Sequence, residues 1–234
     1  MANSPPPIDH SYERFYAQRN GLRVYPTEFV VRTFLAKYPK LNFRKPVADD
    51  RVLDIAFGDG RNTVFLCDQG YAVSGIEITE GIVSQTGERL EKLGHQADLR
   101  VGRNSKMPYE NDYFDYLLAC HCCYYCDEGE TFADNMKEYA RVMKPGAWLV
   151  ASVASRESYI FKDAITLEDG SLRIQADPYG NRDGYRLHAF TSKDEIEAYL
   201  SPWFEHFSFG FADNDFFGVS ERLFWVVCQK REGS

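Results

Sequence analysis

The sequence lacks any apolar run long enough to cross a bilayer, which takes about 20 residues. Its longest apolar stretches, WLVASVA and LFWVVC, are much shorter. It also lacks an excess of positive charge, because 27 Lys and Arg face 35 Asp and Glu and leave a net charge of −8. Such a chain is poorly suited to nucleic-acid phosphates and to anionic lipid surfaces. We therefore expect no nucleic-acid partner and no membrane partner.

The first ten residues, MANSPPPIDH, lack the basic flank and the apolar core of a secretory signal peptide. We expect this Pro-rich stretch to be disordered and the protein to be cytoplasmic. In that compartment the six cysteines should remain reduced thiols. The sequence also shows no internal repeat and no long linker, so its 234 residues are enough for one large α/β domain.

From residue 51 short apolar strands alternate with helices. The expected strands are RVLDIA, YAVSGIEI, ADLRVG, DYFDYLLAC and AWLVASVA, and a helix at 192–200 precedes two more, HFSFGFAD and ERLFWVVCQK. Helices are expected after the glycine turn at 58–60, at 79–93 and at 130–143, with two more near the N-terminus at 11–20 and 26–38. This order predicts an α/β fold with a doubly wound, mostly parallel sheet. Ligands of such sheets bind beyond the carboxyl ends of the strands.

The loop after the first strand, LDIAFGDGRN, carries the clearest binding signal. Gly58 and Gly60 allow a tight turn and a close approach of the backbone to a ligand, and Glu77 ends the next strand, where a carboxylate can hold a ribose diol. A dinucleotide fingerprint needs a third glycine where Thr63 stands, and no Gly-Lys-Ser/Thr is present for a P-loop. Asp54, just before the turn, suits a cationic ligand better than a pyrophosphate. The loop therefore predicts a nucleoside site without a pyrophosphate.

Four stretches in order, covering residues 51–153, resemble the class I S-adenosylmethionine-dependent methyltransferases. They are VLDIAFGDGRN, GYAVSGIEIT, VGRNSKMPYENDYFDYLLA and ARVMKPGAWLVAS. The resemblance implies a Rossmann-like, seven-stranded sheet whose last strand is antiparallel and inserted beside its neighbour, with an N-terminal helical cap. It implies S-adenosyl-L-methionine as cofactor and S-adenosyl-L-homocysteine as product. One domain, 1–234, would comprise a tail and cap (1–45), a cofactor-binding core (46–154), a substrate-side insertion (155–190) and a C-terminal helix with strands (191–234).

The resemblance also implies a set of cofactor contacts. Asp54 would lie near the methionine end, the glycine turn would give close backbone contacts, Glu77 would hold the ribose hydroxyls and Ile78 would pack on adenine. Asn104 and Ser105 would lie at the adenine edge, since Arg103 stands where many relatives have an acidic residue. The full set is Tyr16, Asp54, Ala56, Gly58, Gly60, Asn62, Glu77, Ile78, Asn104, Ser105, Ala119 and Cys120.

The stretch ACHCCYYC, residues 119–126, holds four of the six cysteines. A structural zinc site commonly needs two CxxC-type pairs, and only Cys123 and Cys126 form one. Cys67 and Cys228 lie elsewhere in apolar segments. We expect no metal site, and interpret the cluster as small, soft residues that end a buried strand and line a pocket. A metal or thiol-redox protein remains an alternative.

His121 follows the fourth core strand, beside the expected methyl donor, so it is a candidate general base for a hydroxyl acceptor. The alternative is that His121 only packs or hydrogen-bonds in the wall near the cofactor. His188, in the insertion, is the second candidate base. The substrate-binding candidates are aromatic or basic side chains of the cap, of the cysteine-rich stretch and of the insertion, namely Tyr12, Arg23, Tyr25, Tyr124, Tyr125, Tyr185 and Arg186.

These observations predict a methyltransferase that moves a methyl group to an O or N of a small molecule, with a sugar or related metabolite preferred. The acceptor would be its partner, and the protein a monomer or homodimer. One alternative is a catalytically silent regulatory protein that binds S-adenosylmethionine or a nucleoside. An NAD-dependent oxidoreductase is a further alternative, which Thr63 disfavours.

Overall fold

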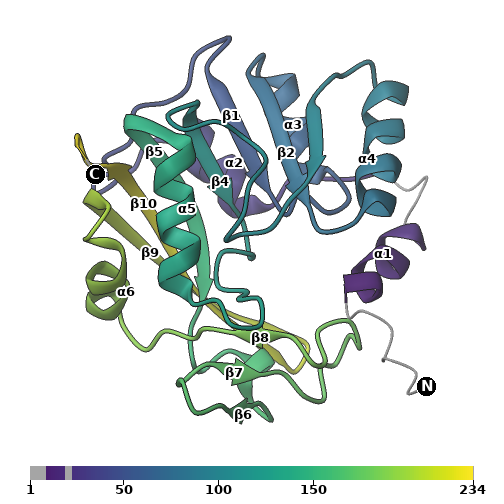
Figure 1. Ribbon diagram of the computed structural model, residues 1–234, viewed down its shortest axis with the longest axis vertical. Coiled ribbons are helices and arrows are strands. Elements are labelled where there is room, and N and C mark those ends of the chain that lie inside the picture. Colours follow the sequence, from purple (N-terminus) through teal and green to yellow (C-terminus); the bar gives the residue numbers. More distant parts are fainter. Residues whose placement is uncertain (1–8, 19–22, 234) are drawn as a thin grey trace.

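A seven-stranded sheet forms the centre of the computed structural model, which describes residues 9–18 and 23–233 (Figure 1). The strand order is β3-β2-β1-β4-β5-β10-β9. The strands are β1 (Arg51–Ile55), β2 (Ala72–Glu77), β3 (Asp98–Val101), β4 (Phe114–Ala119), β5 (Met143–Ala154), β9 (Phe204–Phe216) and β10 (Val219–Lys230). Strands β1 to β5 run parallel, and β10 is antiparallel to both β5 and β9. The predicted mixed sheet with an inserted antiparallel last strand is confirmed.

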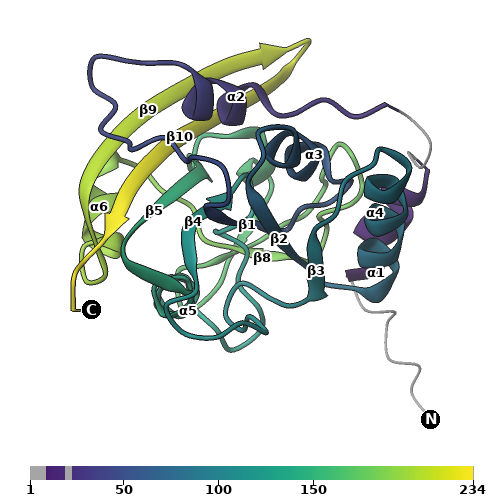
Figure 2. The same ribbon diagram turned by 90° about the horizontal axis from the view of Figure 1, so that it is seen from above.

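Helices cover both faces of this sheet (Figure 2). They are α1 (Asp9–Ala17), α2 (Glu28–Leu35), α3 (Arg61–Asp68), α4 (Glu80–Lys92), α5 (Phe132–Val142) and α6 (Lys193–Leu200). One apolar core forms under α2 and α3, and a larger one forms under α5 and α6. The central strands are buried on both faces, as their continuous apolar runs predict. Within the described residues no helix is both long and apolar enough to span a membrane.

The two N-terminal helices do different work, although the sequence suggests one cap. Helix α2 packs on the sheet, where the rings of Phe29 and Trp225 stack with centroids 5.0 Å apart. Helix α1 lies against α4, near the carboxyl ends of the strands. The predicted first helix at 11–20 and the predicted disordered stretch at 1–10 both fall partly outside the described residues. Of the two helices, α1 is therefore the one placed to cover a ligand.

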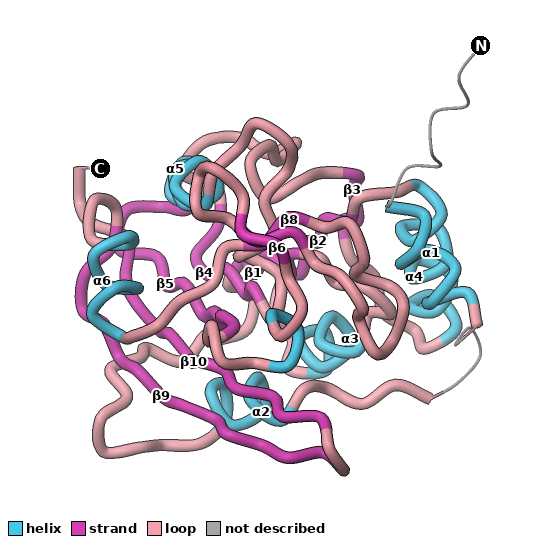
Figure 3. The backbone as a smooth tube through the Cα atoms, turned by 90° about the horizontal axis from the view of Figure 1, so that it is seen from below, coloured by secondary structure: helices cyan, strands magenta, loops and turns pink. Residues whose placement is uncertain are grey.

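The segment at 155–190 follows β5 and forms a small sheet that is not hydrogen-bonded to the main one; in the view from below, β6 and β8 lie in front of β1 and β2 (Figure 3). It contains the short helix η1 (Tyr159–Phe161) and a small antiparallel sheet of β6 (Ile165–Thr166), β7 (Leu172–Arg173) and β8 (Arg186–Leu187). Figure 1 shows this small sheet beyond the carboxyl ends of β1, β4 and β5. The insertion is thereby positioned as a floor opposite the strand ends.

Candidate active site

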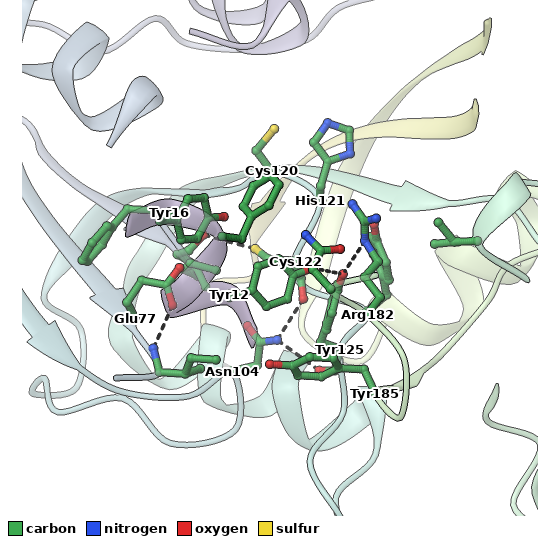
Figure 4. A pocket seen from close by; sticks show the side chains of 18 of the residues that line it. Tyr12, Tyr16, Glu77, Asn104, Cys120, His121, Cys122, Tyr125, Arg182 and Tyr185 are labelled. Atoms are coloured by element: carbon green, nitrogen blue, oxygen red, sulfur yellow. Dashed lines mark hydrogen bonds between the residues drawn. The ribbon is translucent and has the colours of Figure 1, made fainter. Parts of the chain in front are cut away.

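A cavity of about 560 Å³ lies between the strand ends, α1 and the insertion. The sheet order decides which residues meet there. Strands β2 and β1 bring Glu77 and Ala56 to one side, β10 brings Glu221 from the other half of the sheet, and the loop after β4 brings His121 between them. Figure 4 shows the same arrangement, with Glu77 on one side, Arg182 on the other, and Cys120 and His121 between them.

The glycine loop after β1 is held in a conformation that few side chains tolerate. Ala56, Gly58 and Gly60 all have positive φ, at 53°, 57° and 76°. A Cβ on Gly60 would lie 2.7 Å from the Thr86 Cγ2 atom, so glycine is required there. Thr86 Oγ1 also donates a hydrogen bond of 2.7 Å to the Gly58 carbonyl oxygen. Helix α4 therefore fixes the loop that the sequence marks as a ligand cradle.

Glu77 ends β2 as a buried carboxylate at the wall of the cavity. Its Oε1 atom accepts from the backbone N–H of Gly58 at 3.0 Å, and its Oε2 atom accepts from the N–H of Ile78 at 2.8 Å. These bonds orient the carboxylate and tie the ends of β1 and β2 together. A carboxylate has about four lone-pair sites, so a group of this kind can accept both from protein N–H groups and from a diol.

Tyr16 of α1 lies directly over the glycine loop. A Cβ built on Gly58 would come within 2.4 Å of the Tyr16 Oη atom, so the ring needs glycine at that position. Burial, together with the charges of Glu77 and Asp59, raises the pKa of Tyr16 well above its ordinary value. The phenol is therefore a neutral group beside the loop, as a residue that covers a ligand would be.

Asp54 lies behind the loop and outside the lining of the cavity. It is buried, and its Oδ2 atom accepts a hydrogen bond of 2.7 Å from Thr63 Oγ1. Burial raises the pKa of Asp54 to about 7, with further increases from Glu77 and Asp59 and an opposing effect of the Thr63 hydrogen bond. A bound cation would favour its ionised form. Thr63, where the sequence lacks the third glycine, thus serves to hold this carboxyl.

We predict that Asp54→Asn changes the pH dependence of stability. The folded state keeps a proton on Asp54 up to about pH 7, whereas the unfolded state loses it near pH 4, so this group makes stability fall as the pH rises through that window. Relative to Asp54→Asn, which can keep the Thr63 hydrogen bond, the wild type should lose about 2.5 kcal/mol between pH 5 and pH 7.5. Urea unfolding of both proteins at the two pH values measures this difference. Parallel pH dependence in the two proteins would contradict the placement of the proton.

Asn104 lines the cavity, yet its side chain is occupied by the protein. Its Nδ2 atom donates to the carbonyl oxygens of Cys122 and Tyr125 at 2.9 and 3.0 Å, and its Oδ1 atom accepts from Tyr139 Oη at 2.8 Å. Both amide hydrogens are therefore used to shape the loop after β4. Ser105 does not line the cavity. The expected adenine-edge role of these two side chains is not supported by their positions; Asn104 instead positions the pocket wall.

The thiols of the cysteine-rich stretch face inward to protein groups. Cys122 Sγ donates to the Ile55 carbonyl oxygen at 3.2 Å and Cys123 Sγ to the Ser152 carbonyl oxygen at 3.8 Å. Burial raises the pKa of Cys120 and of Cys126 to about 12. Protonated thiols are poor nucleophiles and poor metal ligands. Among the described residues, no three His, Cys, Asp or Glu side chains are grouped so that they could hold a metal ion.

His121 turns the chain from β4 toward the cavity. Its φ is 60°, and its backbone N–H donates to Ser152 Oγ at 2.9 Å, which fixes the turn. Burial lowers the pKa of the imidazole; Arg182 and Arg61 lower it further, while Glu221 opposes them. The ring is therefore neutral near pH 7 and able to accept a proton.

Aromatic residues from three parts of the chain form the far wall of the cavity. Tyr12 Oη and Tyr125 Oη are hydrogen-bonded at 2.7 Å, and the Tyr185 ring lies 5.6 Å from the Tyr12 ring and 5.5 Å from the Tyr125 ring. Tyr124 also lines the cavity. These four substrate candidates are thus brought together, although they are up to 173 positions apart in the sequence.

The structure adds residues that the sequence analysis does not single out. Arg182 lines the cavity, donates from Nε to Tyr125 Oη at 3.2 Å and from Nη1 to the buried Asp177 carboxylate at 3.1 Å. Tyr159 and Glu221 line the same region. The only sequence signal for Arg182 is its place in the turn DPYGNRDGYR, which does not tell a pocket residue from a surface one.

Four of the catalytic and substrate-binding candidates lie outside the cavity lining. The His188 ring is packed in an aromatic cluster, 5.5 Å from Phe132 and 4.7 Å from Tyr199, so it is not placed to act as the base. Arg186 is buried as a structural residue that donates to Ser171 Oγ and to the Asp127 carbonyl oxygen.

The remaining two candidates outside the lining are Arg23 and Tyr25. They are exposed in the segment between α1 and α2, with the guanidinium over the Tyr25 ring. Their predicted substrate role is not supported by these positions, because neither side chain lines the cavity.

Comparison with known proteins identifies the class to which this fold belongs. The chain is similar to a SAM-dependent methyltransferase from Methanosarcina mazei, with a TM-score of 0.64 and 24% identity over 84% of this chain and 99% of that chain. It is also similar to the N-methyltransferase NodS from Bradyrhizobium japonicum in complex with S-adenosyl-L-homocysteine, with a TM-score of 0.64 and 14% identity over 97% and 100% of the two chains. The fold is therefore the Rossmann-like methyltransferase fold.

Residues 53–151 match the family described as methyltransferase domain. Together with the fold, this match identifies residues 53–151 as a methyltransferase domain of the class I, S-adenosylmethionine-dependent kind. Curated relatives include the 23S rRNA (uracil(1939)-C(5))-methyltransferase RlmD of Tolumonas auensis, 26% identical over 182 residues, and the provisionally named methyltransferase YqeM of Bacillus subtilis, 23% identical over 146 residues. The chain spans 38% and 56% of the lengths of these two relatives.

The residues present fit this family's cofactor, S-adenosylmethionine. The cavity reaches the glycine loop at Ala56, Phe57 and Asp59, while Gly58 and Gly60 are buried beneath Tyr16 and Thr86. The oriented Glu77 carboxylate suits a ribose diol, and the buried Asp54 suits a nearby cation. No basic side chain that would suit a pyrophosphate follows the glycine loop except Arg61, which is paired with Asp59 at 2.7 Å. These protein groups therefore suit a nucleoside that carries a cationic substituent.

Proposed function

We propose that the protein transfers the methyl group of S-adenosylmethionine to an O or N atom of a small molecule, with a sugar or related metabolite as the preferred class. The main supporting observation is the shape of the cavity, which joins the cofactor side at Glu77 to a chamber lined by α1 and the insertion. A chamber of limited volume suits a small acceptor, because a macromolecule needs an extended groove. Its volume of about 560 Å³ lies within the range of small-ligand sites.

The residues of this chain would contribute positioning, exclusion of water and proton transfer. When bound, S-adenosylmethionine supplies a methyl group on a positively charged sulfur. Glu77 and the glycine loop would hold the nucleoside part, and Tyr16 would cover it. Tyr12, Tyr125 and Tyr185 would close the chamber against water, with Tyr125 fixed by Arg182. His121 would accept the proton that the acceptor atom loses, since its lowered pKa keeps it neutral near pH 7.

Transfer of labelled methyl groups tests this proposal. Purified protein is incubated with methyl-labelled S-adenosylmethionine and, separately, with the small-molecule fraction, total RNA and total protein of a bacterial extract. We expect label in the small-molecule fraction alone. Label in RNA would overturn the proposal in favour of an activity like that named for the relative RlmD. Calorimetry with S-adenosylhomocysteine that shows tight binding, without label in any fraction, would favour the regulatory alternative.

A further inference from the structure

Three of the four carboxylates that line the cavity are already satisfied by protein groups. Asp59 pairs with Arg61 at 2.7 Å, Asp127 pairs with Arg103 at 2.7 Å, and Glu77 accepts from two backbone N–H groups. Glu221 differs, because no hydrogen bond or ion pair joins its carboxylate to any other residue within 9–18 and 23–233. Among the described residues, Glu221 is thus the one carboxylate of the cavity lining without a hydrogen-bond or ion-pair partner in the protein.

Glu221 lies at the acceptor end of the cavity. It is on β10, where Glu221 and Leu223 are two positions apart and therefore point to the same face of the strand. Both line the chamber. Strand β10 is separated from the cofactor side by β5 and β4, so His121 lies between Glu221 and Glu77. The carboxylate therefore faces the space left for the acceptor.

The other charges of the chamber do not neutralise Glu221. Each cation of the lining has its own carboxylate: Arg61 has Asp59, Arg103 has Asp127, and Arg182 has Asp177, whose side chain is fully buried. The local balance at the acceptor end is therefore one negative charge. A cation bound there would gain from both this charge and the reduced exposure to water.

The walls near Glu221 are rich in tyrosine. Besides Tyr16 on the cofactor side, the tyrosines that line the cavity are Tyr12, Tyr124, Tyr125, Tyr159, Tyr179 and Tyr185. Aromatic faces attract ammonium groups, and a carboxylate among such rings is a recognised way to hold them. A neutral polyol would gain from the rings as well, but it would leave the charge of Glu221 without a counter-ion.

We propose that the methyl acceptor is an amine, and that Glu221 binds its ammonium group at the chamber wall opposite the cofactor side. This inference rests on the proposed function and narrows its acceptor class. The bound nitrogen passes a proton to the imidazole of His121. Its lone pair then forms the new C–N bond as the C–S bond breaks, and the electron pair of that bond stays on sulfur. The methylated nitrogen carries the positive charge away.

Chemical blocking of amines tests the acceptor class directly. The small-molecule extract is treated with acetic anhydride in aqueous bicarbonate, which acetylates amines in preference to hydroxyls, and is then offered with methyl-labelled S-adenosylmethionine. We expect incorporation to fall at least about tenfold relative to the untreated extract. Unchanged incorporation into the treated extract would overturn the amine inference and leave the methyltransferase proposal intact. No label in the untreated extract would instead overturn the proposed function.

A variant tests the role of Glu221. With the labelled acceptor fraction, Glu221→Gln should raise the KM for acceptor about tenfold or more, because a charge-assisted hydrogen bond is lost, while the affinity for S-adenosylhomocysteine stays unchanged. Asp213→Asn is the matched control: it removes one negative charge from the facing strand β9, outside the cavity, where Asp213 pairs with Arg222. Equal KM values for Glu221→Gln and wild type would overturn the assignment. Retained S-adenosylhomocysteine binding shows that the variant is folded.

Discussion

Glu77→Ala should weaken the binding of S-adenosylhomocysteine about 10- to 100-fold, since hydrogen bonds to a charged group contribute about 1.5–3 kcal/mol each. Two effects combine in this variant. The carboxylate that would hold the ribose diol is lost, and so is the acceptor of the Gly58 N–H that closes the glycine loop at 3.0 Å. Isothermal titration calorimetry measures the change.

Glu77→Gln separates these two effects. Glutamine can still accept from the Gly58 N–H, so the loop stays in place while the charge and one acceptor oxygen disappear. We expect an intermediate affinity for this variant. Glu88→Gln on α4 is the matched control, because Glu88 is exposed and its contact with Lys92 is 4.0 Å long. Wild-type affinity in Glu77→Ala would sink the placement of the cofactor at the ends of β1 and β2.

His121→Asn should lower kcat about 100- to 10,000-fold and change the affinity for S-adenosylhomocysteine little, as loss of a general base does. Asparagine is the suitable replacement because His121 has a φ of 60°, a left-handed conformation that asparagine adopts more readily than most residues. It cannot accept a proton near pH 7. A labelled-methyl assay at saturating cofactor measures kcat.

The pH profile distinguishes a base from a wall residue. Burial, Arg182 and Arg61 lower the pKa of His121, with Glu221 opposing, so the wild-type rate should fall only below the ordinary imidazole range. That acidic limb should be absent from His121→Asn. The control is His206→Asn, an exposed position on β9 that also has a positive φ, of 57°. An acidic limb that persists unchanged in His121→Asn would mean that His121 only lines the pocket.

Much of the cofactor side is readable from local sequence. The glycine loop and Glu77 lie at fixed positions after two short buried strands, and parallel strands bring such positions to one edge of the sheet. The difference from a dinucleotide-binding fingerprint is also visible in the local sequence, because Thr63 stands where that fingerprint has its third glycine. Its role as hydrogen-bond donor to Asp54 needs the folded helix α3.

The residues of the acceptor side cannot be identified from local sequence. Arg186 and His188 resemble pocket residues in the sequence, yet they point into the insertion and into an aromatic cluster, whereas Arg182, four residues before Arg186, lines the cavity. Which side chain of an irregular segment faces inward depends on turns with no fixed period. Asn104 is a similar case, because its expected ligand contact is replaced by hydrogen bonds to the loop after β4.

The sequence by itself determined the α/β fold and the nucleoside-type glycine loop with Glu77, because strand periodicity and short-range spacing carry that information. The resemblance to the methyltransferase family implied the cofactor. Only the tertiary structure decided that His121, Arg182 and Glu221 share one chamber. These residues come from the loop after β4, the insertion and β10, and the antiparallel insertion of β10 beside β5 brings them together. Contacts between segments so distant in the chain are set by strand order and side-chain packing, which no local pattern encodes.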